Sequence, residues 1–324
     1  MSWLVTGSAG FIGFHVAACL LGRGEHVIGV DNLNAYYDVK LKQTRLGILN
    51  AYDTFEFHRI DLTDLSAMTA LVERYSDIDT IIHLAAQAGV RYSLADPLAY
   101  VDANVKGQVV LLEVARKLRK LRSLVYASSS SVYGNGTKQP FSTEDRVEHP
   151  VSLYAATKRA GELITESYCQ LYGLSCTGLR FFTLYGPWGR PDMAYYSFTE
   201  AILANRPIQV FNEGRLARDF TYVDDAVPAI LAAAALPGAQ PGEHRLYNIG
   251  NNRPESLLDF IAVLEDALGR RAIKEMLPMQ PGDVLKTYAD IAPAQRDLGF
   301  NPETPITIGL PRFVAWYRQY HGVA

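Results

Sequence analysis

The sequence is poor in cysteine and has no long apolar run. Its three cysteines, Cys19, Cys169 and Cys176, lack the spacing of metal ligands. They argue against a disulfide framework or a metal centre and favour small buried side chains in a reducing cytosol. No apolar stretch approaches the roughly 18 residues of a membrane-spanning helix. No basic segment precedes the first apolar residues, so we expect no signal peptide and a cytoplasmic protein.

An excess of charge of either sign is also absent. The 324 residues include 31 Lys and Arg and 34 Asp and Glu, which gives a net charge of -3. This balance argues against a nucleic-acid or membrane surface, so an anionic partner has to be met by local cations. With 48% hydrophobic and 20% charged residues, the composition is that of a folded enzyme. The length predicts one large α/β domain with a smaller second lobe.

The first motif is a glycine turn after a short apolar segment. Residues 2–6 have the pattern of a buried strand, and residues 14–21 have helical apolar spacing. Between them lie Gly7, Gly10 and Gly13. In such a unit the glycines permit a tight turn, close approach of a pyrophosphate to the backbone, and packing of helix on strand. The N–H groups at the helix start attract the pyrophosphate, so the pattern predicts a dinucleotide site.

The next predicted strand, residues 26–30, ends in an acidic side chain. Asp31 can accept hydrogen bonds from the ribose hydroxyls of an adenosine, and it repels a 2′-phosphate. This favours NAD over NADP. Three basic residues downstream weaken that exclusion, namely Lys40, Lys42 and Arg45.

Strand and helix patterns keep alternating up to residue 127, which predicts a doubly wound parallel sheet of the Rossmann type. We expect one long helix at residues 97–118, with Asn104 midway. Ala85 and Ala86 follow a predicted strand and suit either a cofactor diphosphate or plain close packing. The other residues expected to contact the cofactor are Phe11, Ile12, Asn32, Asp61, Leu62, Leu84 and Asn104.

A tyrosine and a lysine four residues apart form the second motif. In a helix, Tyr154 and Lys158 emerge on one face. The cation is expected to stabilise the phenolate and lower the tyrosine pKa from about 10 toward that of a general base. Chance alone produces such a pair on many helices. Here the glycine turn, Asp31 and four serines at 128–131 accompany the pair, and together they predict an acid/base site.

The alternating pattern ends after residue 182. Residues 185–193 are rich in turn formers and rings, as in a binding loop, and residues 223–236 form an alanine-rich helix. We expect a dinucleotide-binding domain at 1–180 with a returning segment near 223–250. A discontinuous substrate lobe is then expected from residues 181–222 and 251–324.

Four motifs occur together in this chain. They are the glycine turn, the serines before Val132-Tyr133-Gly134, the Tyr154 and Lys158 pair, and segment 218–225. Together they resemble the extended short-chain dehydrogenase/reductases that act on nucleotide sugars, over essentially the whole chain. Within that family, residues 83–93 and 186–194 are similar to the UDP-glucuronate 4-epimerases.

The resemblance implies permanently held NAD, Tyr154 as the base toward the C4 hydroxyl of a UDP-sugar, and Lys158 between Tyr154 and the nicotinamide ribose. Alignment on Val132-Tyr133-Gly134 places the catalytic serine at Ser129. The family also implies a homodimer through the helices that carry Asn104 and Tyr154. The chemistry needs the same parts, because hydride leaves C4 only when its hydroxyl loses the proton. The 4-keto sugar then rotates and takes the hydride back on its other face.

The choice of sugar and reaction rests on three local features. Ser130 and Ser131 stand where related dehydratases carry Asp-Glu and decarboxylases carry Glu. Arg190 can bind a carboxylate in bidentate fashion, although it could instead cap a surface loop. Thr183 replaces the Asn of the epimerases that act on neutral hexoses. Since a 4-keto uronate is a β-keto acid, we expect Arg190, Thr183 and the serines to hold its carboxylate where decarboxylation is disfavoured.

The nucleotide contacts are less sharply defined by the sequence. Arg218 suits a phosphate, although segment 219–225 could equally be a strand-to-helix join capped by Asp224. Gln280 stands where related epimerases of neutral sugars have Arg. The other candidates for substrate contact are Gln87, Ser93, Gln209, Phe211 and Asp283.

The leading hypothesis is therefore reversible C4 epimerisation of UDP-glucuronate and UDP-galacturonate with NAD. An alternative is a UDP-glucose/UDP-galactose 4-epimerase. A third, of another class, is a non-catalytic NAD-binding regulatory protein. It is disfavoured because the tyrosine, lysine and serines are all intact.

Overall fold

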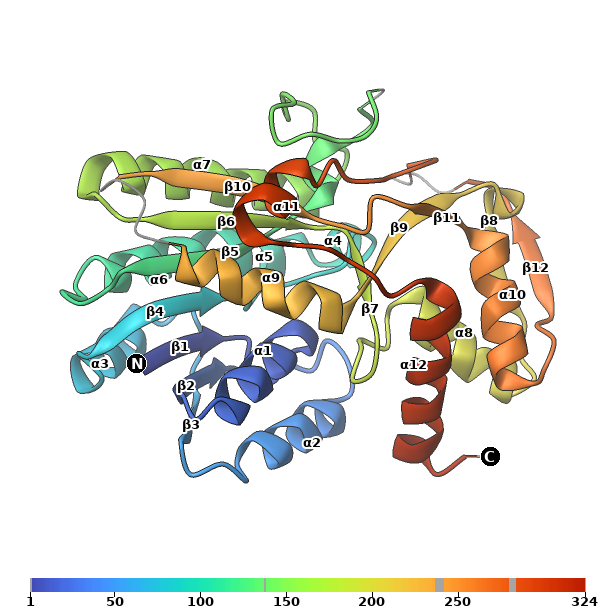
Figure 1. Ribbon diagram of the computed structural model, residues 1–324, viewed down its shortest axis with the longest axis horizontal. Coiled ribbons are helices and arrows are strands. Elements are labelled where there is room, and N and C mark those ends of the chain that lie inside the picture. Colours follow the sequence, from blue (N-terminus) through green and yellow to red (C-terminus); the bar gives the residue numbers. More distant parts are fainter. Residues whose placement is uncertain (1, 137, 237–241, 280–283, 324) are drawn as a thin grey trace.

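Seven parallel strands form the central sheet of the described chain (Figure 1). The computed structural model describes residues 2–136, 138–236, 242–279 and 284–323. The strands lie in the order β10, β6, β5, β4, β1, β2, β3. The connections reverse direction between β1 and β4, which leaves a crevice at the carboxyl ends of these strands. The bounds are β1 (Ser2–Thr6), β2 (His26–Asp31), β3 (Phe55–Arg59), β4 (Ile78–His83), β5 (Ser123–Ser129), β6 (Cys176–Phe181) and β10 (His244–Ile249).

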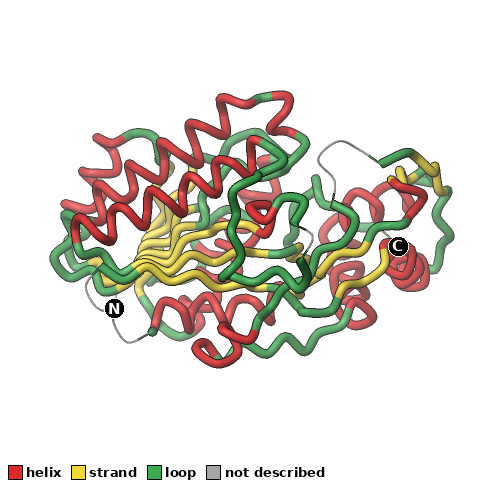
Figure 2. Tube along the Cα trace, turned by 90° about the horizontal axis from the view of Figure 1, so that it is seen from above, coloured by secondary structure: helices red, strands yellow, loops and turns green. Residues whose placement is uncertain are grey.

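Helices cover both faces of the sheet (Figure 2). One face carries α1 (Phe11–Gly22), α2 (Val39–Leu49), α9 (Val223–Ala235) and α11 (Ala292–Leu298), and the other carries α3 (Leu65–Arg74), α6 (Gly107–Ala115) and α7 (Leu153–Tyr172). A strand covered on both faces has to be apolar throughout, and every residue of β1 is buried. The predicted doubly wound parallel sheet is confirmed.

The single helix expected at residues 97–118 is interrupted. Two short helices, α4 (Tyr92–Ala95) and α5 (Pro97–Tyr100), lead into a π-helical segment, Val101–Lys106, before α6 begins. In this wider turn Asn104 donates to the Gln87 oxygen over 3.0 Å and to Thr157 Oγ1 of α7 over 3.0 Å. Apolar spacing does not distinguish a π turn from an α turn, so the sequence could not predict it.

The smaller lobe lies beyond the carboxyl ends of the sheet (Figure 1). A three-stranded sheet in the order β11, β9, β7 and a two-stranded sheet of β12 and β8 form it with three helices. Phe220 and Phe260 stack in its core with ring centroids 4.2 Å apart. The bounds are β7 (Thr183–Tyr185), α8 (Ala194–Leu203), β8 (Ile208–Phe211), β9 (Ala217–Tyr222), β11 (Pro254–Ser256), α10 (Leu257–Leu268), β12 (Lys274–Leu277) and α12 (Ile306–His321). Among the described residues, no helix is both long and apolar enough to cross a membrane.

Residues 223–249 run back from this lobe to the central sheet. Helix α9 packs against α1, and β10 pairs in parallel with β6, with His244 opposite Cys176. The chain therefore leaves the large sheet after β6 and adds one more strand to it later.

Candidate active site

A cavity of about 850 Å³ opens at the carboxyl ends of the strands. The glycine turn (residues 7–13), the end of β2, the serine run (residues 128–131), α7 and loop 183–193 contribute to its wall. Its volume is at the upper end of the range of small-molecule sites. The predicted site residues that line it are Gly7, Gly10, Phe11, Ile12, Gly13, Asp31, Asn32, Asp61, Leu62, Leu84, Ala85, Ala86, Gln87, Ser129, Ser130, Tyr154, Lys158, Thr183 and Arg190.

The glycine turn leaves no room for side chains. Gly7 has φ +71°, and a Cβ placed on it would lie 2.7 Å from the Ala85 nitrogen. A Cβ on Gly13 would lie 2.0 Å from the Gly7 oxygen. These contacts support the close-packing role of Ala85 without excluding a cofactor contact. Asp31, at the end of β2, accepts from the Leu33 amide over 2.8 Å.

Arg45 of α2 connects the glycine turn to loop 183–193. Its fully buried guanidinium donates to the Ala9 oxygen over 2.8 Å and to the Trp188 and Gly189 oxygens over 2.6 and 3.1 Å. Three carbonyls from two distant segments are thus held by one side chain. The sequence indicated Arg45 only as a charge near the ribose site.

Tyr154 and Ser129 both line the cavity. Burial raises the tyrosine pKa above its ordinary value, while Ser129 and the charge of Arg190 act to lower it. The expectation that Lys158 lowers this pKa is therefore not met. The Lys158 ammonium instead donates to the Ala127 oxygen over 2.9 Å. Burial lowers the pKa of Lys158 to about 8, with Glu162 acting in the opposite direction.

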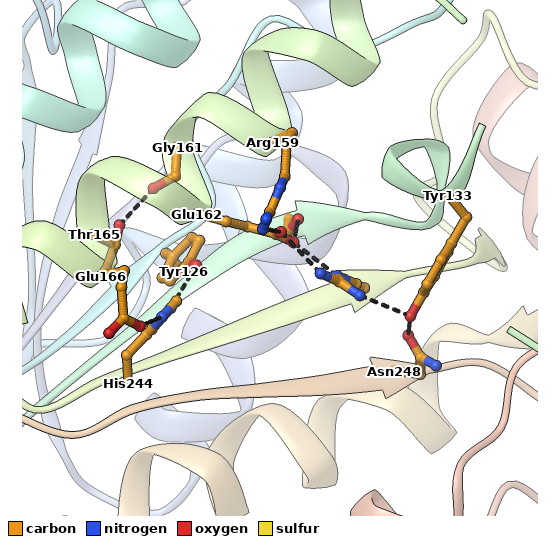
Figure 3. A network of polar contacts seen from close by, with 11 residues as sticks. Tyr126, Tyr133, Arg159, Gly161, Glu162, Thr165, Glu166, His244 and Asn248 are labelled. Carbon is orange, nitrogen blue, oxygen red and sulfur yellow. Dashed lines mark hydrogen bonds and ion pairs between the residues drawn. The ribbon is translucent and has the colours of Figure 1, made fainter. Parts of the chain in front are cut away.

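A buried ion pair joins α7 to β6. Glu162 accepts from Arg180 over 2.8 and 2.9 Å and from Arg159 over 2.9 Å. Burial opposes its ionisation, but the Arg180 charge and these bonds keep its pKa below the ordinary value. Arg180 also donates to the Tyr133 hydroxyl, which donates to Asn248 (Figure 3). Sequence reasoning missed this network, although an arginine inside an apolar strand is a usable signal.

Arg190 lines the cavity and is paired within its own loop. Its Nε donates to Asp192 Oδ1 over 3.0 Å and its Nη2 to Asp192 Oδ2 over 2.6 Å. The hydroxyl of Tyr36 donates to Asp192 Oδ2 over 3.1 Å. Burial alone would raise the pKa of Asp192, but the Arg190 charge lowers it, so the carboxylate stays ionised. The pair with Asp192 fits a loop cap, and the position in the cavity wall fits a substrate contact, so both interpretations of Arg190 stay open.

Relatives of this protein are known along its whole length. Residues 3–250 match the NAD dependent epimerase/dehydratase family. The chain belongs to this family.

The relatives of this epimerase/dehydratase include enzymes named for one substrate. A UDP-glucuronate 4-epimerase of Arabidopsis thaliana is 46% identical over 334 residues, which cover 99% of this chain and 76% of that protein. A probable UDP-glucuronate 4-epimerase of Rhizobium meliloti is 44% identical, over 98% of this chain and 97% of that protein. The crystal structure of a UDP-glucuronic acid 4-epimerase of Bacillus cereus, in complex with UDP-glucuronic acid and NAD, is 34% identical, with a TM-score of 0.91 over 99% of this chain and 100% of that chain. The resemblance drawn from the sequence is confirmed.

NAD is the cofactor of this epimerase/dehydratase, and the cavity fits it. The glycine turn offers exposed backbone where a Cβ would clash. Helix α1 follows with Gly10 as its N-cap, whose missing side chain leaves the first-turn N–H groups available to a diphosphate. Asp31 supplies the carboxylate suited to ribose hydroxyls. These residues would hold the dinucleotide.

Several predicted residues of the epimerase/dehydratase lie elsewhere. Asn104 is held behind the cavity wall by Gln87 and Thr157. The other predicted residues outside the cavity wall are Ser93, which donates to the Val90 oxygen over 2.6 Å, Gln209, exposed on β8, Phe211, with the Arg91 guanidinium 4.5 Å from its ring centroid, and Arg218, which donates to the Ala217 oxygen over 3.0 Å. Gln280 and Asp283 lie outside the described residues.

Sequence reasoning also missed residues that the structure brings to the site. Asn34 and Tyr36 line the cavity, and so does Lys42, which the sequence indicated only as a charge that weakens the exclusion of NADP. Arg215 and Lys286 line a second, open hollow in the smaller lobe. Tyr36 could have been predicted as a cavity residue, because it follows β2 closely and the carboxyl ends of parallel strands lie at one edge of the sheet.

Proposed function

We propose that this protein catalyses the reversible C4 epimerisation of UDP-glucuronate and UDP-galacturonate through a 4-keto intermediate. One observation supports this most directly. Arg190, a cation suited to a sugar carboxylate, lines the same cavity as Tyr154 and Ser129. Relatives named as UDP-glucuronate 4-epimerases agree with it.

Tyr154 acts as the base toward the C4 hydroxyl, and Ser129 shares the transferred proton. When bound, NAD supplies the hydride acceptor and donor for C4. The charge of Arg190 favours the phenolate form that Tyr154 needs as a base. Lys158, next to this site, adds positive charge and would contact the nicotinamide ribose. The serine run is kept in place by Glu162, to which Ser128 donates over 2.6 Å.

The carboxylate of the sugar is assigned to Arg190, with Thr183 and Ser130 as further partners. All three line the cavity. A 4-keto uronate loses carbon dioxide when its carboxylate stands perpendicular to the ketone plane. Hydrogen bonds and charge at the carboxylate can hold it away from that geometry. Related dehydratases and decarboxylases carry acidic residues at the positions of Ser130 and Ser131. Their absence here agrees with epimerisation.

A second candidate is epimerisation of UDP-glucose and UDP-galactose. Turnover rates distinguish the two candidates. A faster rate with UDP-glucose than with UDP-glucuronate would favour this second function. The regulatory alternative predicts no isomerisation of any UDP-sugar. For the nucleotide we retain Gln87, Gln209, Phe211, Arg218 and Asp283 as candidates, and Ser93 stays a candidate for substrate contact.

The proposal includes a homodimer formed through the helical segment that carries Asn104 (residues 97–115) and α7, which carries Tyr154. Leu98 and Val101 on the first are 72% and 41% exposed, and Leu163 and Leu171 on α7 are 54% and 68% exposed. Apolar side chains gathered on neighbouring helices are typical of an interface. Sedimentation of wild type and Leu98→Glu tests it, and a monomeric wild type contradicts it. We also propose a cytoplasmic location, since all three cysteines are free thiols.

The deciding experiment is product analysis with UDP-glucuronate and no added NAD. We expect UDP-galacturonate to form until equilibrium, because NAD stays bound during purification. Dinucleotide absorbance in the purified protein provides the matched check on cofactor retention. A protein that retains the dinucleotide but leaves UDP-glucuronate unchanged contradicts the proposal.

A further inference from the structure

Asp192 occupies one side of the guanidinium that is assigned to the substrate. The side-on pair uses the Nε and Nη2 hydrogens of Arg190. A second carboxylate therefore meets Arg190 from its Nη1 end. Tyr36 donates to the same Asp192 oxygen as Nη2, so the aspartate is held from two segments of the chain.

The pair also changes the charge that a substrate meets. Arg190 and Asp192 have side chains only 22% and 27% exposed, so water screens their charges incompletely. A uronate carboxylate is attracted by the guanidinium and repelled by the carboxylate beside it. The net attraction is smaller than that of an unpaired arginine.

An epimerase needs a limited hold on this carboxylate. The 4-keto sugar has to present both faces of C4 in turn, and its carboxylate moves with the ring. A contact that is equally strong throughout slows this rotation without lowering the barrier to chemistry. A second partner for Arg190 can replace the substrate carboxylate while the sugar turns.

We infer that Asp192 is a specificity-determining residue, a built-in competitor for Arg190 that keeps the hold on the uronate loose enough for the sugar to rotate. This inference rests on the proposed function. It differs from a purely structural role, in which Asp192 only orients Arg190 and its loss weakens substrate binding. The sign of the change in affinity separates the two.

The test is Asp192→Asn, whose amide oxygen still accepts from Tyr36 but carries no charge. We expect the UDP-glucuronate dissociation constant, measured by calorimetry in a Tyr154→Phe background to prevent turnover, to fall about three- to tenfold. When Tyr154 is kept and only Asp192→Asn is present, kcat should fall by a similar factor, because release of the carboxylate then limits rotation of the sugar. Affinity for UDP-xylose, which lacks the carboxylate, should stay within about twofold.

The control is Asp53→Asn, the same loss of charge in an exposed turn at the amino end of β3. If Asp192→Asn does not fold, Asp192→Ser removes the charge without an amide and replaces it in each assay. Weaker or unchanged UDP-glucuronate binding overturns the inference, and so does equal tightening of UDP-xylose. Tighter binding with undiminished kcat overturns the role in rotation. These results leave the proposed function intact, whereas a wild type that does not convert UDP-glucuronate refutes both.

Discussion

Ser128 and Glu162 lie 2.6 Å apart, hydroxyl to carboxylate, although one ends a strand and the other belongs to α7. Ser128 neighbours Ser129, and Glu162 lies one helical turn beyond Lys158 on α7. The contact therefore joins the serine run to the helix of Tyr154, and it makes the buried pair of Glu162 and Arg180 part of the site's framework.

Glu162→Gln should destabilise the fold by about 3–5 kcal/mol, because it leaves the Arg180 charge buried without its partner. Denaturant unfolding with NAD retained measures this free energy. Glu166→Gln, one turn further along α7 with 47% of the side chain exposed, is the matched control and should change stability by less than about 1 kcal/mol. An equal loss of unfolding free energy in the two variants would show that the buried pair contributes no more to stability than an exposed one.

The pH dependence of kcat/KM should have an alkaline limb near pH 8. The pKa of Lys158 is lowered to about 8 by burial, so its ammonium is present below this pH and is lost above it. Activity that needs the ammonium therefore declines as pH rises. Lys158→Arg keeps its charge throughout the range. Whatever its absolute rate, this variant should lose the limb, and an unmoved limb would assign the titration to another group.

Gly13→Ala should yield protein without bound dinucleotide, because the new Cβ would lie 2.0 Å from the Gly7 oxygen and deform the turn. The ratio of dinucleotide to protein absorbance measures the loss. Gly22→Ala, at the other end of α1, has nothing within 4 Å of its new Cβ and should retain full occupancy. Normal occupancy in Gly13→Ala would mean that the turn is not the dinucleotide site.

Tyr154→Phe should lower kcat by about 10²- to 10⁴-fold while leaving UDP-glucuronate affinity near that of wild type, since only the proton-transferring hydroxyl is removed. Single-turnover kinetics and calorimetry separate the two effects. Tyr172→Phe, at the exposed end of the same helix, provides the control. Retained turnover would exclude Tyr154 as the base.

Arg190→Ala should weaken UDP-glucuronate binding by about tenfold or more, the value of a charge-assisted hydrogen bond. It should also raise the share of pentose product, because the carboxylate is freer to reach the geometry for decarboxylation. Product analysis by chromatography reports both the epimer and the pentose. Arg206→Ala removes an exposed arginine paired with Glu200 and should alter neither. Unchanged affinity and partition would exclude Arg190 as the carboxylate partner.

Local spacing made much of this site predictable. Gly7, Asp31 and Tyr154 each belong to short motifs in which neighbouring residues meet because of the strand or helix that contains them. These motifs predicted the fold class, the cofactor and part of the cavity wall.

Burial and distant pairing were not predictable in the same way. Tyr36 meets Asp192 across 156 residues of sequence, and no spacing rule connects them. The cation near Tyr154 was expected to lower its pKa, but the effect of desolvation depends on how completely the folded chain covers the hydroxyl. The positions of Gln209 and Arg218 outside the cavity depend on how the small lobe meets the sheet, which the sequence does not specify locally.

Arg45 links two parts of the cavity wall. Since its guanidinium joins the Ala9 carbonyl of the glycine turn to the Trp188 and Gly189 carbonyls of loop 183–193, a ligand that orders one segment restrains the other. Thermodynamic linkage is reciprocal. A dinucleotide that stays bound between turnovers would therefore have a second role. It would keep loop 183–193 ordered before the next sugar nucleotide binds.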